Sequence, residues 1–352
     1  MMIALGCLTI IALAIYLLAV ITDEFFIPSL DRFAQRFQLP GSVAGASLMA
    51  MGSSAPELSI ALLSLFKAGG AHSDVGIGTI VGSAVFNILV ITGVSAIVQP
   101  AHVSWRVVVR DVVMYVASIA LLLATFADGR ITVAEALAFL VLYGVYLFIL
   151  FQWETASPIE MTDGVAVSER TTPTHSSGWL YRAHMLVITA MGRLTGHAHI
   201  TYIRAFLVSV AVIAVISWVL VDVAVVLAGA IGLPPVIVAL TILAGGTSVP
   251  DMMASIIVAR QGRGEMAIVN AIGSNIFDIL VGLGLPWLIV LAIRGKTVQV
   301  GTGELWFSTL VLLSTVVLLY IFLTTGRRLS RREGWVLLGV YTAYVLWTWL
   351  GS

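Results

Sequence analysis

Charged residues are scarce in this sequence. Asp, Glu, Lys and Arg make up 10% of its 352 residues, against about 25% in soluble domains. The 18 acidic and 18 basic residues cancel, so no excess charge indicates a nucleic acid or an acidic partner. A single cysteine, Cys7, excludes a disulfide within the chain. With 60% hydrophobic residues and a mean hydropathy of +1.06, the composition is that of a membrane protein.

Ten apolar runs are long enough to cross a bilayer, which takes about 20 residues in a helix. We therefore expect an all-α integral membrane protein with ten transmembrane helices. They are predicted at about 2–22, 40–66, 75–98, 107–127, 131–151, 203–228, 233–260, 265–293, 304–325 and 333–350. The first run is too long for a signal-peptide core, and we interpret it as an uncleaved helix. Residues 152–202 are polar and rich in turn formers, which predicts a loop. Within it, Trp179 to Leu194 can form a surface helix.

Lys and Arg are distributed unevenly between the two sides of the membrane. If the N-terminus is outside, 14 of them lie on the inner side and 4 on the outer side. Cytoplasmic loops carry the excess of Lys and Arg. The pattern therefore predicts that both termini are outside and that the loop 152–202 is cytoplasmic.

Two short motifs occur twice in the chain, in the same order. GSSAPE at 52–57 recurs as GTSVPD at 246–251, and IVGSAVFNILVITG at 80–93 recurs as AIGSNIFDILVGLG at 271–284. Aligning 74–93 with 265–284 gives eight identities in 20 positions. We therefore predict two homologous halves, 1–151 and 203–352, joined by the loop 152–202. The repeated segments lie at about 40–98 and 233–293.

Each half contains five of the predicted helices. Because five is odd, the second half enters the membrane from the opposite side, which makes an inverted-topology repeat. In secondary transporters of this kind the site lies near the bilayer midplane, between the repeats and at interrupted helices. Pro56 and Pro250 predict such interruptions, because a proline frees the carbonyl four residues before it.

The repeated blocks also concentrate acids and hydroxyls in the middle of apolar runs. A carboxylate at the bilayer centre costs about 3 kcal/mol or more, and no Lys or Arg occurs in the four blocks to pair with it. We therefore predict a cation site made of hard oxygen ligands, which suits Ca²⁺, Na⁺ or K⁺ rather than zinc or copper. Three carboxylates would balance three positive charges, such as one Ca²⁺ with one monovalent ion. The candidate side chains are Glu57, Asp251, Asp278, Asn87, Ser53, Ser54, Thr247, Ser248, Ser83 and Ser274.

These blocks resemble those of the sodium/calcium exchanger superfamily, whose two alpha repeats carry GxSxPE/D and GSxxFN/D motifs. The chain looks most like the potassium-dependent sodium/calcium exchangers. The resemblance is carried by DEFFIPSL at 23–30, VAGASLMAMGSSAPEL at 43–58, DVGIGTIVGSAVFNIL at 74–89 and the block from GGTSVPD at 245–251 to GLPW at 284–287.

The resemblance implies a ten-helix transporter of the plasma membrane that works by alternating access, with no enzymatic activity and no cofactor. Its partners would be membrane lipid and the ions Ca²⁺, Na⁺ and K⁺. Glu57 and Asp251 would coordinate Ca²⁺, and an Asp at position 278 goes with potassium dependence. The flanking Na⁺ sites would be formed by the paired hydroxyls, Asn87, Asp278 and carbonyls near Ala50 and Ala244.

Three other functions are compatible with some of these features. A proton/calcium exchanger would use the same acids, but it needs fewer hydroxyls than GSSAPE and GTSVPD offer. A passive cation channel must bind its ion loosely, which three acids in interrupted helices disfavour. An intramembrane hydrolase could use Asp251 and Asp278, but no feature of the sequence indicates how it would bind a substrate. The expected function is therefore exchange of Na⁺ for Ca²⁺, with K⁺ transported together with Ca²⁺.

Overall fold

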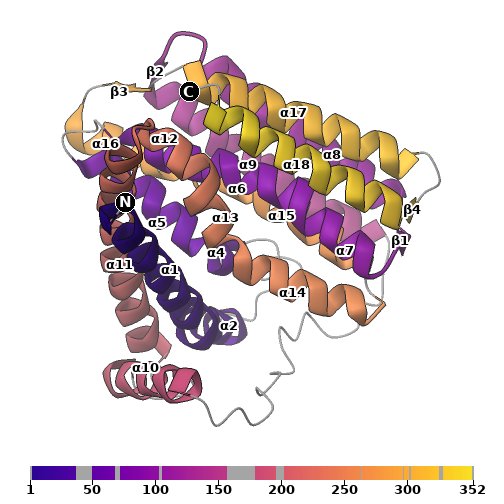
Figure 1. Cartoon of the computed structure of the whole chain (residues 1–352). Helices are drawn as coiled ribbons and strands as arrows, with labels where there is room; N and C mark the ends of the chain where they lie inside the picture. Colours follow the sequence, from indigo (N-terminus) through magenta and orange to yellow (C-terminus); the bar gives the residue numbers. More distant parts are fainter. Residues whose placement is uncertain are drawn as a thin grey trace.

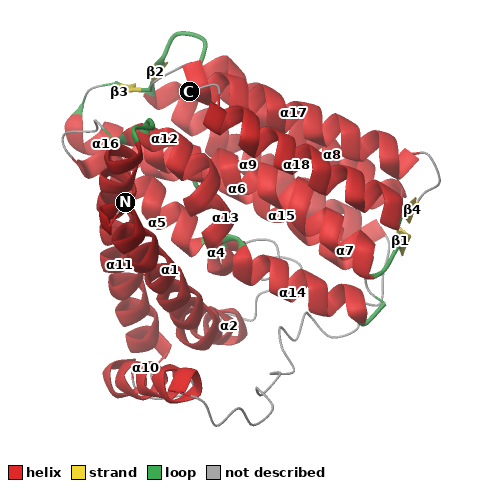
Figure 2. Cartoon of the chain, viewed as in Figure 1, coloured by secondary structure: helices red, strands yellow, loops and turns green. Residues whose placement is uncertain are grey.

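Helices make up nearly all of the described part of the chain (Figure 2). The computed structural model describes residues 2–36, 50–67, 72–102, 105–156, 179–195, 202–262, 264–295, 297–300, 303–324 and 328–350. The described strands form two antiparallel pairs of two residues each: β1 (Ala101–His102) with β4 (Arg328–Leu329), and β2 (Arg130–Ile131) with β3 (Val298–Gln299). The predicted all-α class is confirmed.

The helices of the two halves are shown in Figure 1. Those before the long loop are α1 (Met2–Ile21), α2 (Ile27–Arg36), α4 (Ala50–Ser53), α5 (Ala55–Phe66), α6 (Ser73–Phe86), α7 (Thr92–Val98), α8 (Trp105–Thr125) and α9 (Val133–Ala156). Those after it begin with α10 (Trp179–Thr195), α11 (Tyr202–Ile231), α12 (Pro235–Val238), α13 (Ala244–Thr247) and α14 (Val249–Arg260). They end with α15 (Gly264–Leu280), α16 (Gly284–Arg294), α17 (Gly303–Thr324) and α18 (Arg331–Leu350). In the described residues, three π-helical turns join consecutive helices, at Thr22–Phe26, Asn87–Ile91 and Ala239–Leu243.

Seven helices in the described residues are long and apolar enough to cross a bilayer, or eight if one bent pair counts as a single span. They are Met2–Leu30, Ser73–Val98, Val108–Thr125, Val133–Gln152, Tyr202–Ile231, Gly264–Arg294 and Gly303–Thr324, with Pro235–Thr247 and Val249–Arg260 as the bent pair. Of the other two predicted spans, 40–66 begins outside the described residues. The span 333–350 forms as helix α18, whose Trp and Tyr side chains lower its hydropathy.

The first helix extends beyond its predicted end at residue 22. It continues through the π-helical turn Thr22–Phe26 into α2, as far as Arg36. The sequence suggests an end here because Asp23, Glu24 and Pro28 are unfavourable in a membrane helix. A π-helical turn lets a helix pass a proline by bonding its backbone groups in a wider register, and here the N–H of Ile27 bonds to the carbonyl of Thr22.

The long loop contains the predicted surface helix. It is α10, which runs from Trp179 to Thr195 and packs against α11. Tyr16 of α1 also contacts this helix, through a hydrogen bond of 2.8 Å between its hydroxyl and Nδ1 of His184. Residues 157–178 and 196–201 of the predicted loop lie outside the described residues.

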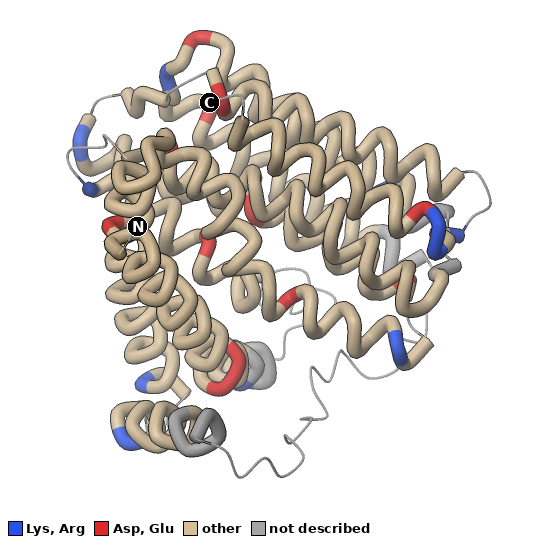
Figure 3. The backbone as a smooth tube through the Cα atoms, viewed as in Figure 1, with Lys and Arg blue, Asp and Glu red and all other residues tan. Residues whose placement is uncertain are grey.

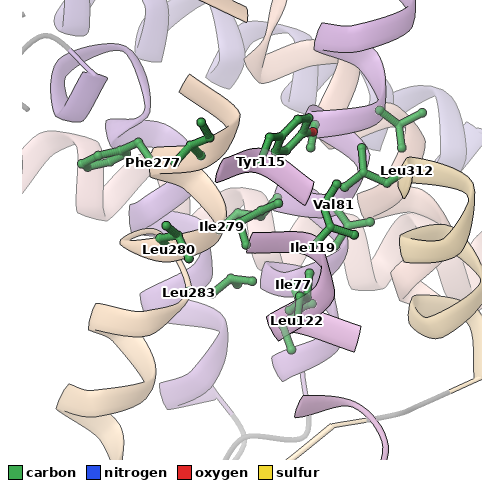
Figure 4. Packing of buried hydrophobic residues seen from close by; sticks show 14 of the residues in the cluster. Ile77, Val81, Tyr115, Ile119, Leu122, Phe277, Ile279, Leu280, Leu283 and Leu312 are labelled. Carbon is green, nitrogen blue, oxygen red and sulfur yellow. The ribbon is translucent and has the colours of Figure 1, made fainter. Parts of the chain in front are cut away.

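The core of the molecule is built around α6. The span Ser73–Val98 is the most buried of the seven, as expected for a helix that is apolar on all sides. Figure 4 shows Ile77 and Val81 of α6 packed with Tyr115 and Ile119 of α8 and with side chains of α15 and α17. This packing holds the polar end of α6 in the centre of the bundle, between the two halves of the chain.

The helix α6 packs closely against the backbone of the second half at Gly82. A Cβ atom on Gly82 would lie 2.7 Å from both Cα and the carbonyl carbon of Leu240, in the turn Ala239–Leu243. Backbone atoms cannot rotate away, so Gly82→Ala should destabilise the protein by about 1–3 kcal/mol or more, as overpacking does. We expect the unfolding midpoint of the purified protein in detergent to fall by several degrees.

Gly144→Ala is the matched control for this prediction. A Cβ atom on Gly144, in the middle of α9, meets nothing within 4 Å. Both substitutions gain the same helix propensity, so the difference between the two midpoints isolates the steric term. Equal midpoints for the two variants would contradict the close packing of α6 on Leu240.

The helices α1 and α11 pack along each other at one side of the bundle (Figure 1). Both expose large apolar side chains, for example Leu5 and Leu13 of α1 and Val215 of α11, which suits a surface in contact with lipid. The inner face of the helix that runs from α1 into α2 touches both proline motifs. A Cβ atom on Gly52 would meet Ile27 at 2.9 Å, and one on Gly246 would meet Ile15. One continuous helix therefore covers both GSSAPE and GTSVPD.

Candidate cation site

Each proline motif lies at a break between two helices. α4 ends at Ser53 and α5 begins at Ala55, while α13 ends at Thr247 and α14 begins at Val249. Pro56 and Pro250 are each the second residue of the later helix. The missing N–H costs little there, because the first N–H groups of a helix have no partner within it. The second break bends the chain by 43°, and both lie where the prolines predict them.

The breaks place an acid in the first turn of each following helix. Glu57 is the third residue of α5, and Asp251 is the third residue of α14. The positive end of a helix stabilises a carboxylate by about 0.3–1 kcal/mol, and Glu57 also accepts a hydrogen bond from its own N–H. This is less than the cost of burying a carboxylate in a membrane. The position of Glu57 therefore lowers that cost without removing it.

Hydrogen bonds join the four motifs across the two halves. Glu57 of the first half bonds to Thr247 of the second half, and Asp278 of the second half bonds to Ser54 of the first half. The hydroxyls of Ser83 and Ser248 lie 2.7 Å apart. Each of these contacts pairs one residue from residues 1–151 with one from residues 203–352. The site is thus shared between the halves.

Three oxygens of this site are buried without a hydrogen-bond partner. They are Oε2 of Glu57, Oδ1 of Asn87 and Oδ1 of Asp278, in side chains exposed by 3%, 1% and 2%. Buried polar groups in folded proteins are nearly always bonded, and an unmet buried acceptor costs about 1–3 kcal/mol or more if charged. Unpaired oxygens in these motifs fit ligands of a cation.

Asp251 differs from the other two acids because its side chain is partly exposed. Its charge interacts with those of Glu57 and Asp278. The three carboxylates do not form one metal-binding cluster, since no three His, Cys, Asp or Glu side chains in the described ranges are grouped closely enough to hold an ion. A cation bound here would need hydroxyl, amide or carbonyl oxygens in addition to the carboxylates.

The remaining predicted ligands are engaged in helix bonds or lie at the margin. The hydroxyl of Ser274 donates to the carbonyl of Ala271 in its own helix, at 3.2 Å. The carbonyl of Ala244 accepts the N–H of Ser248 and the hydroxyl of Thr247, both at 3.3 Å. Ser53 is partly exposed at the end of α4, and Ala50 is the first residue of that helix. Hydrogen bonds thus join Glu57, Asp278 and four of the hydroxyls across the two halves, and Asn87 is joined to the second half through Asn275. Ser274 bonds only within its own helix among the contacts described here.

Two residues of the site are absent from the sequence-based prediction. Asn275 accepts a 2.8 Å hydrogen bond from Nδ2 of Asn87, and its own Nδ2 donates to the hydroxyl of Tyr115 at 2.8 Å. Asn275 follows Ser274 in the motif GSNIFD, at a position where the first half has Ala84. A polar residue present in only one of two repeats is the signal that could have identified it.

Positive charges lie away from these acids. Figure 3 shows Lys and Arg at the ends of the helical bundle, whereas acidic residues also occur within it. The ion pairs Lys67–Asp222, at 2.5 Å, and Arg110–Asp111, at 2.7 Å, involve other acids. The site therefore has negative charge and neutral oxygens, and its own motifs contain no Lys or Arg to balance them.

A nearly all-helical membrane protein with an oxygen-rich site formed by residues from both halves of the chain belongs to the class of ion transporters rather than enzymes. Residues 7–152 and 201–350 match the sodium/calcium exchanger protein family. Because the match covers most of the chain, the chain belongs to this family, and it is a membrane transporter.

Curated relatives and solved structures agree with this family. The chain is 28% identical to sodium/potassium/calcium exchanger 4 of Mus musculus, over 94% of this chain and 78% of the relative. It is 27% identical to sodium/potassium/calcium exchanger 5 of Homo sapiens, over 92% and 79%. Its fold is similar to the H⁺/Ca²⁺ exchanger CAX, with a TM-score of 0.68, 14% identity and 97% and 82% of the two chains covered. The sodium–calcium exchanger NCX_Mj is also similar, with a TM-score of 0.56, 21% identity and 98% of each chain covered.

Proposed function

We propose that this protein exchanges Na⁺ for Ca²⁺ across the plasma membrane and transports K⁺ together with Ca²⁺. The observation that carries the proposal is the set of unpaired, buried oxygens of Glu57, Asn87 and Asp278, which lie among hydroxyls from both halves. Carboxylate, amide and hydroxyl oxygens are the ligands of hard cations. The names of the curated relatives, which are sodium/potassium/calcium exchangers, support the same choice of ions.

Exchange follows if the same acids bind either ion. Because Na⁺ and Ca²⁺ would both need Glu57 and Asp251, occupation by one excludes the other, and the two flows are coupled. Contacts such as Glu57–Thr247 and Ser83–Ser248 cross between the halves. A small movement of one half against the other would therefore break these contacts and open the site toward one side of the membrane. Alternating access is the corresponding transport mechanism.

We further propose a ten-helix inverted repeat with both termini outside. The strand pairs support this topology, because β1 and β4 join two loops that it puts inside and β2 and β3 join two that it puts outside. Lys67 and Asp222, an ion-paired couple, both fall near the outer surface. Arg331 and its acceptor, the carbonyl of Val98, both fall near the inner surface.

The test is Ca²⁺ uptake by proteoliposomes in which the Na⁺, K⁺ and pH gradients are varied one at a time. We expect an outward Na⁺ gradient to drive Ca²⁺ uptake and K⁺ on the Ca²⁺ side to increase it. Uptake driven by a pH gradient alone would instead identify a proton/calcium exchanger, for which the fold similarity to CAX is the supporting observation. Flux that depends on no counter-ion would indicate a channel.

A further inference from the structure

Asn87 has an amide group, and only one of its two ends can bind a cation. A carboxylate offers two oxygens, so a cation finds a ligand whichever way the group is turned. An amide offers an oxygen at one end and an NH₂ donor at the other, and the donor repels a cation. If Asn87 is to act as a ligand, something must hold its oxygen toward the site.

The neighbouring Asn275 supplies that restraint, and a backbone carbonyl fixes its own orientation. Nδ2 of Asn275 lies 3.1 Å from the carbonyl oxygen of Ala84. A carbonyl oxygen can only accept, so the end of Asn275 that contacts it must be the NH₂ group. The same Nδ2 donates to the hydroxyl of Tyr115 at 2.8 Å. The oxygen of Asn275 must therefore point the other way.

That oxygen determines which way Asn87 faces. Oδ1 of Asn275 can only accept, and it lies 2.8 Å from Nδ2 of Asn87. The NH₂ end of Asn87 is thus held against Asn275, and its oxygen is left without a hydrogen-bond partner in a side chain that is 1% exposed. Asn275 is fully buried, so water does not compete for these bonds. The carbonyl of Ala84 thus fixes the orientation of the Asn275 amide, and Asn275 fixes the orientation of the Asn87 amide.

Local structure holds Ala84, Asn87 and Tyr115 in place. The N–H of Asn87 bonds to the carbonyls of Ser83 and Ala84, and Asn87 begins the π-helical turn Asn87–Ile91. Tyr115 is fully buried on α8 among the apolar side chains seen in Figure 4. Ala84 and Asn87 therefore belong to α6 and its end, Asn275 to α15 and Tyr115 to α8.

The repeats explain why only one half contains such an asparagine. The position of Asn275 corresponds to Ala84 in the first half, and that of Asn87 corresponds to Asp278 in the second half. Asn275 thus accompanies the amide at position 87, and by the symmetry of the repeats its counterpart Ala84 accompanies the carboxylate at position 278. A carboxylate needs no such restraint, because both of its ends are oxygens.

We propose that Asn275, anchored by the Ala84 carbonyl and Tyr115, is a positioning residue that keeps the oxygen of Asn87 directed at the transported cation. The inference rests on the proposed function, in which Asn87 is a cation ligand. It predicts that Asn275 matters only while residue 87 is an amide. In an Asn87→Asp protein, the anchored oxygen of Asn275 would face a carboxylate oxygen, and its removal should cost nothing or help.

The test is a double-mutant cycle with four proteins: wild type, Asn275→Ala, Asn87→Asp and the double variant. Na⁺ and Ca²⁺ are the probes, and their half-saturating concentrations are taken from the cation-dependent rise of the unfolding midpoint in detergent. We expect Asn275→Ala to raise at least one of them about tenfold in the wild type, as loss of a group that orients a ligand does. In the Asn87→Asp background we expect less than about a twofold rise, or a fall. If Asn275→Ala does not fold, Asn275→Ser replaces it in the cycle.

The outcomes separate the inference from the proposed function. A role of Asn275 in packing alone would change the half-saturating concentrations by the same factor in both backgrounds, and that result would overturn the inference. So would the absence of any change. A wild-type protein whose midpoint responds to neither ion would contradict the proposed cation site itself.

Discussion

Replacing Glu57 by Gln should abolish Ca²⁺ transport while leaving the protein folded. The substitution keeps the size of the side chain and removes its charge. At an effective dielectric constant of about 20, two unit charges 4 Å apart attract by about 4 kcal/mol, and a divalent ion doubles this attraction. Since about 1.4 kcal/mol is a tenfold change in affinity, we expect Ca²⁺ binding to weaken by at least about 100-fold. Asp251→Asn should have the same effect.

The unfolding midpoint distinguishes this loss from misfolding. Without a bound cation, Oε2 of Glu57 is a buried acceptor with no partner. Removing the charge therefore removes a cost, and Glu57→Gln should unfold at the same or a higher temperature than the wild type in buffer free of Na⁺ and Ca²⁺. The wild-type midpoint should rise with Ca²⁺, as a bound ligand requires. The midpoint of Glu57→Gln should not.

Glu304→Gln is the matched control for this change. It makes the same chemical substitution in the first turn of α17, where the side chain is exposed. Initial rates of radioactive Ca²⁺ uptake into proteoliposomes should be unchanged in Glu304→Gln and at background in Glu57→Gln. Normal uptake by Glu57→Gln would show that the proposed site is wrong.

The sequence predicts the elements of the fold well because bilayer-spanning helices have a simple signature. Long apolar runs identify helices such as α8, α11 and α17, and the prolines at 56 and 250 identify both breaks. The sequence does not predict where a helix continues through an irregular turn. At Thr22–Phe26 a π-helical turn carries the chain past two acids and a proline, and hydropathy cannot distinguish that from an end.

The site is predicted residue by residue but not contact by contact. The duplicated motifs identify Glu57 and Asp278, since acids without basic partners are costly in apolar runs. They do not show that Glu57 meets Thr247 while Asp278 meets Ser54. Such partners depend on how the helices of one half rotate and pack against those of the other, and spacing within a motif contains no information about that.

Asn275 shows a second limit of reasoning from repeats. Comparison of the halves emphasises positions that match, and Asn275 stands where they differ. Ser274 illustrates the opposite error. It matches Ser83 in the other half, yet its hydroxyl bonds to Ala271 in its own helix, as single hydroxyls in helices often do. The repeated motifs indicate where a site lies. The packing of the helices decides which of two equivalent residues takes part in it.

The second large effect is expected from Asp278→Asn, which should remove the dependence on K⁺ and spare Na⁺-driven Ca²⁺ uptake. Three carboxylates whose charges interact balance three positive charges, which one Ca²⁺ and one K⁺ would supply. Removing one carboxylate leaves two negative charges, which Ca²⁺ balances alone. The oxygen of an Asn at this position can still accept a hydrogen bond from Ser54, so this contact between the halves is kept.

The measurement is the initial rate of Ca²⁺ uptake with and without K⁺, at constant ionic strength and a fixed Na⁺ gradient. We expect K⁺ to stimulate the wild type and to leave the rate of Asp278→Asn unchanged. Asp128→Asn, an exposed acid in the turn before β2, is the control and should respond like the wild type. Asp278 is buried beside Ser54 and interacts with the charges of both other acids. Replacing it therefore changes the charge of the site, while Glu57 and Asp251, the proposed Ca²⁺ ligands, stay in place. An Asp278→Asn protein that transports Ca²⁺ with an unaltered K⁺ response would show that K⁺ is not bound on account of this charge.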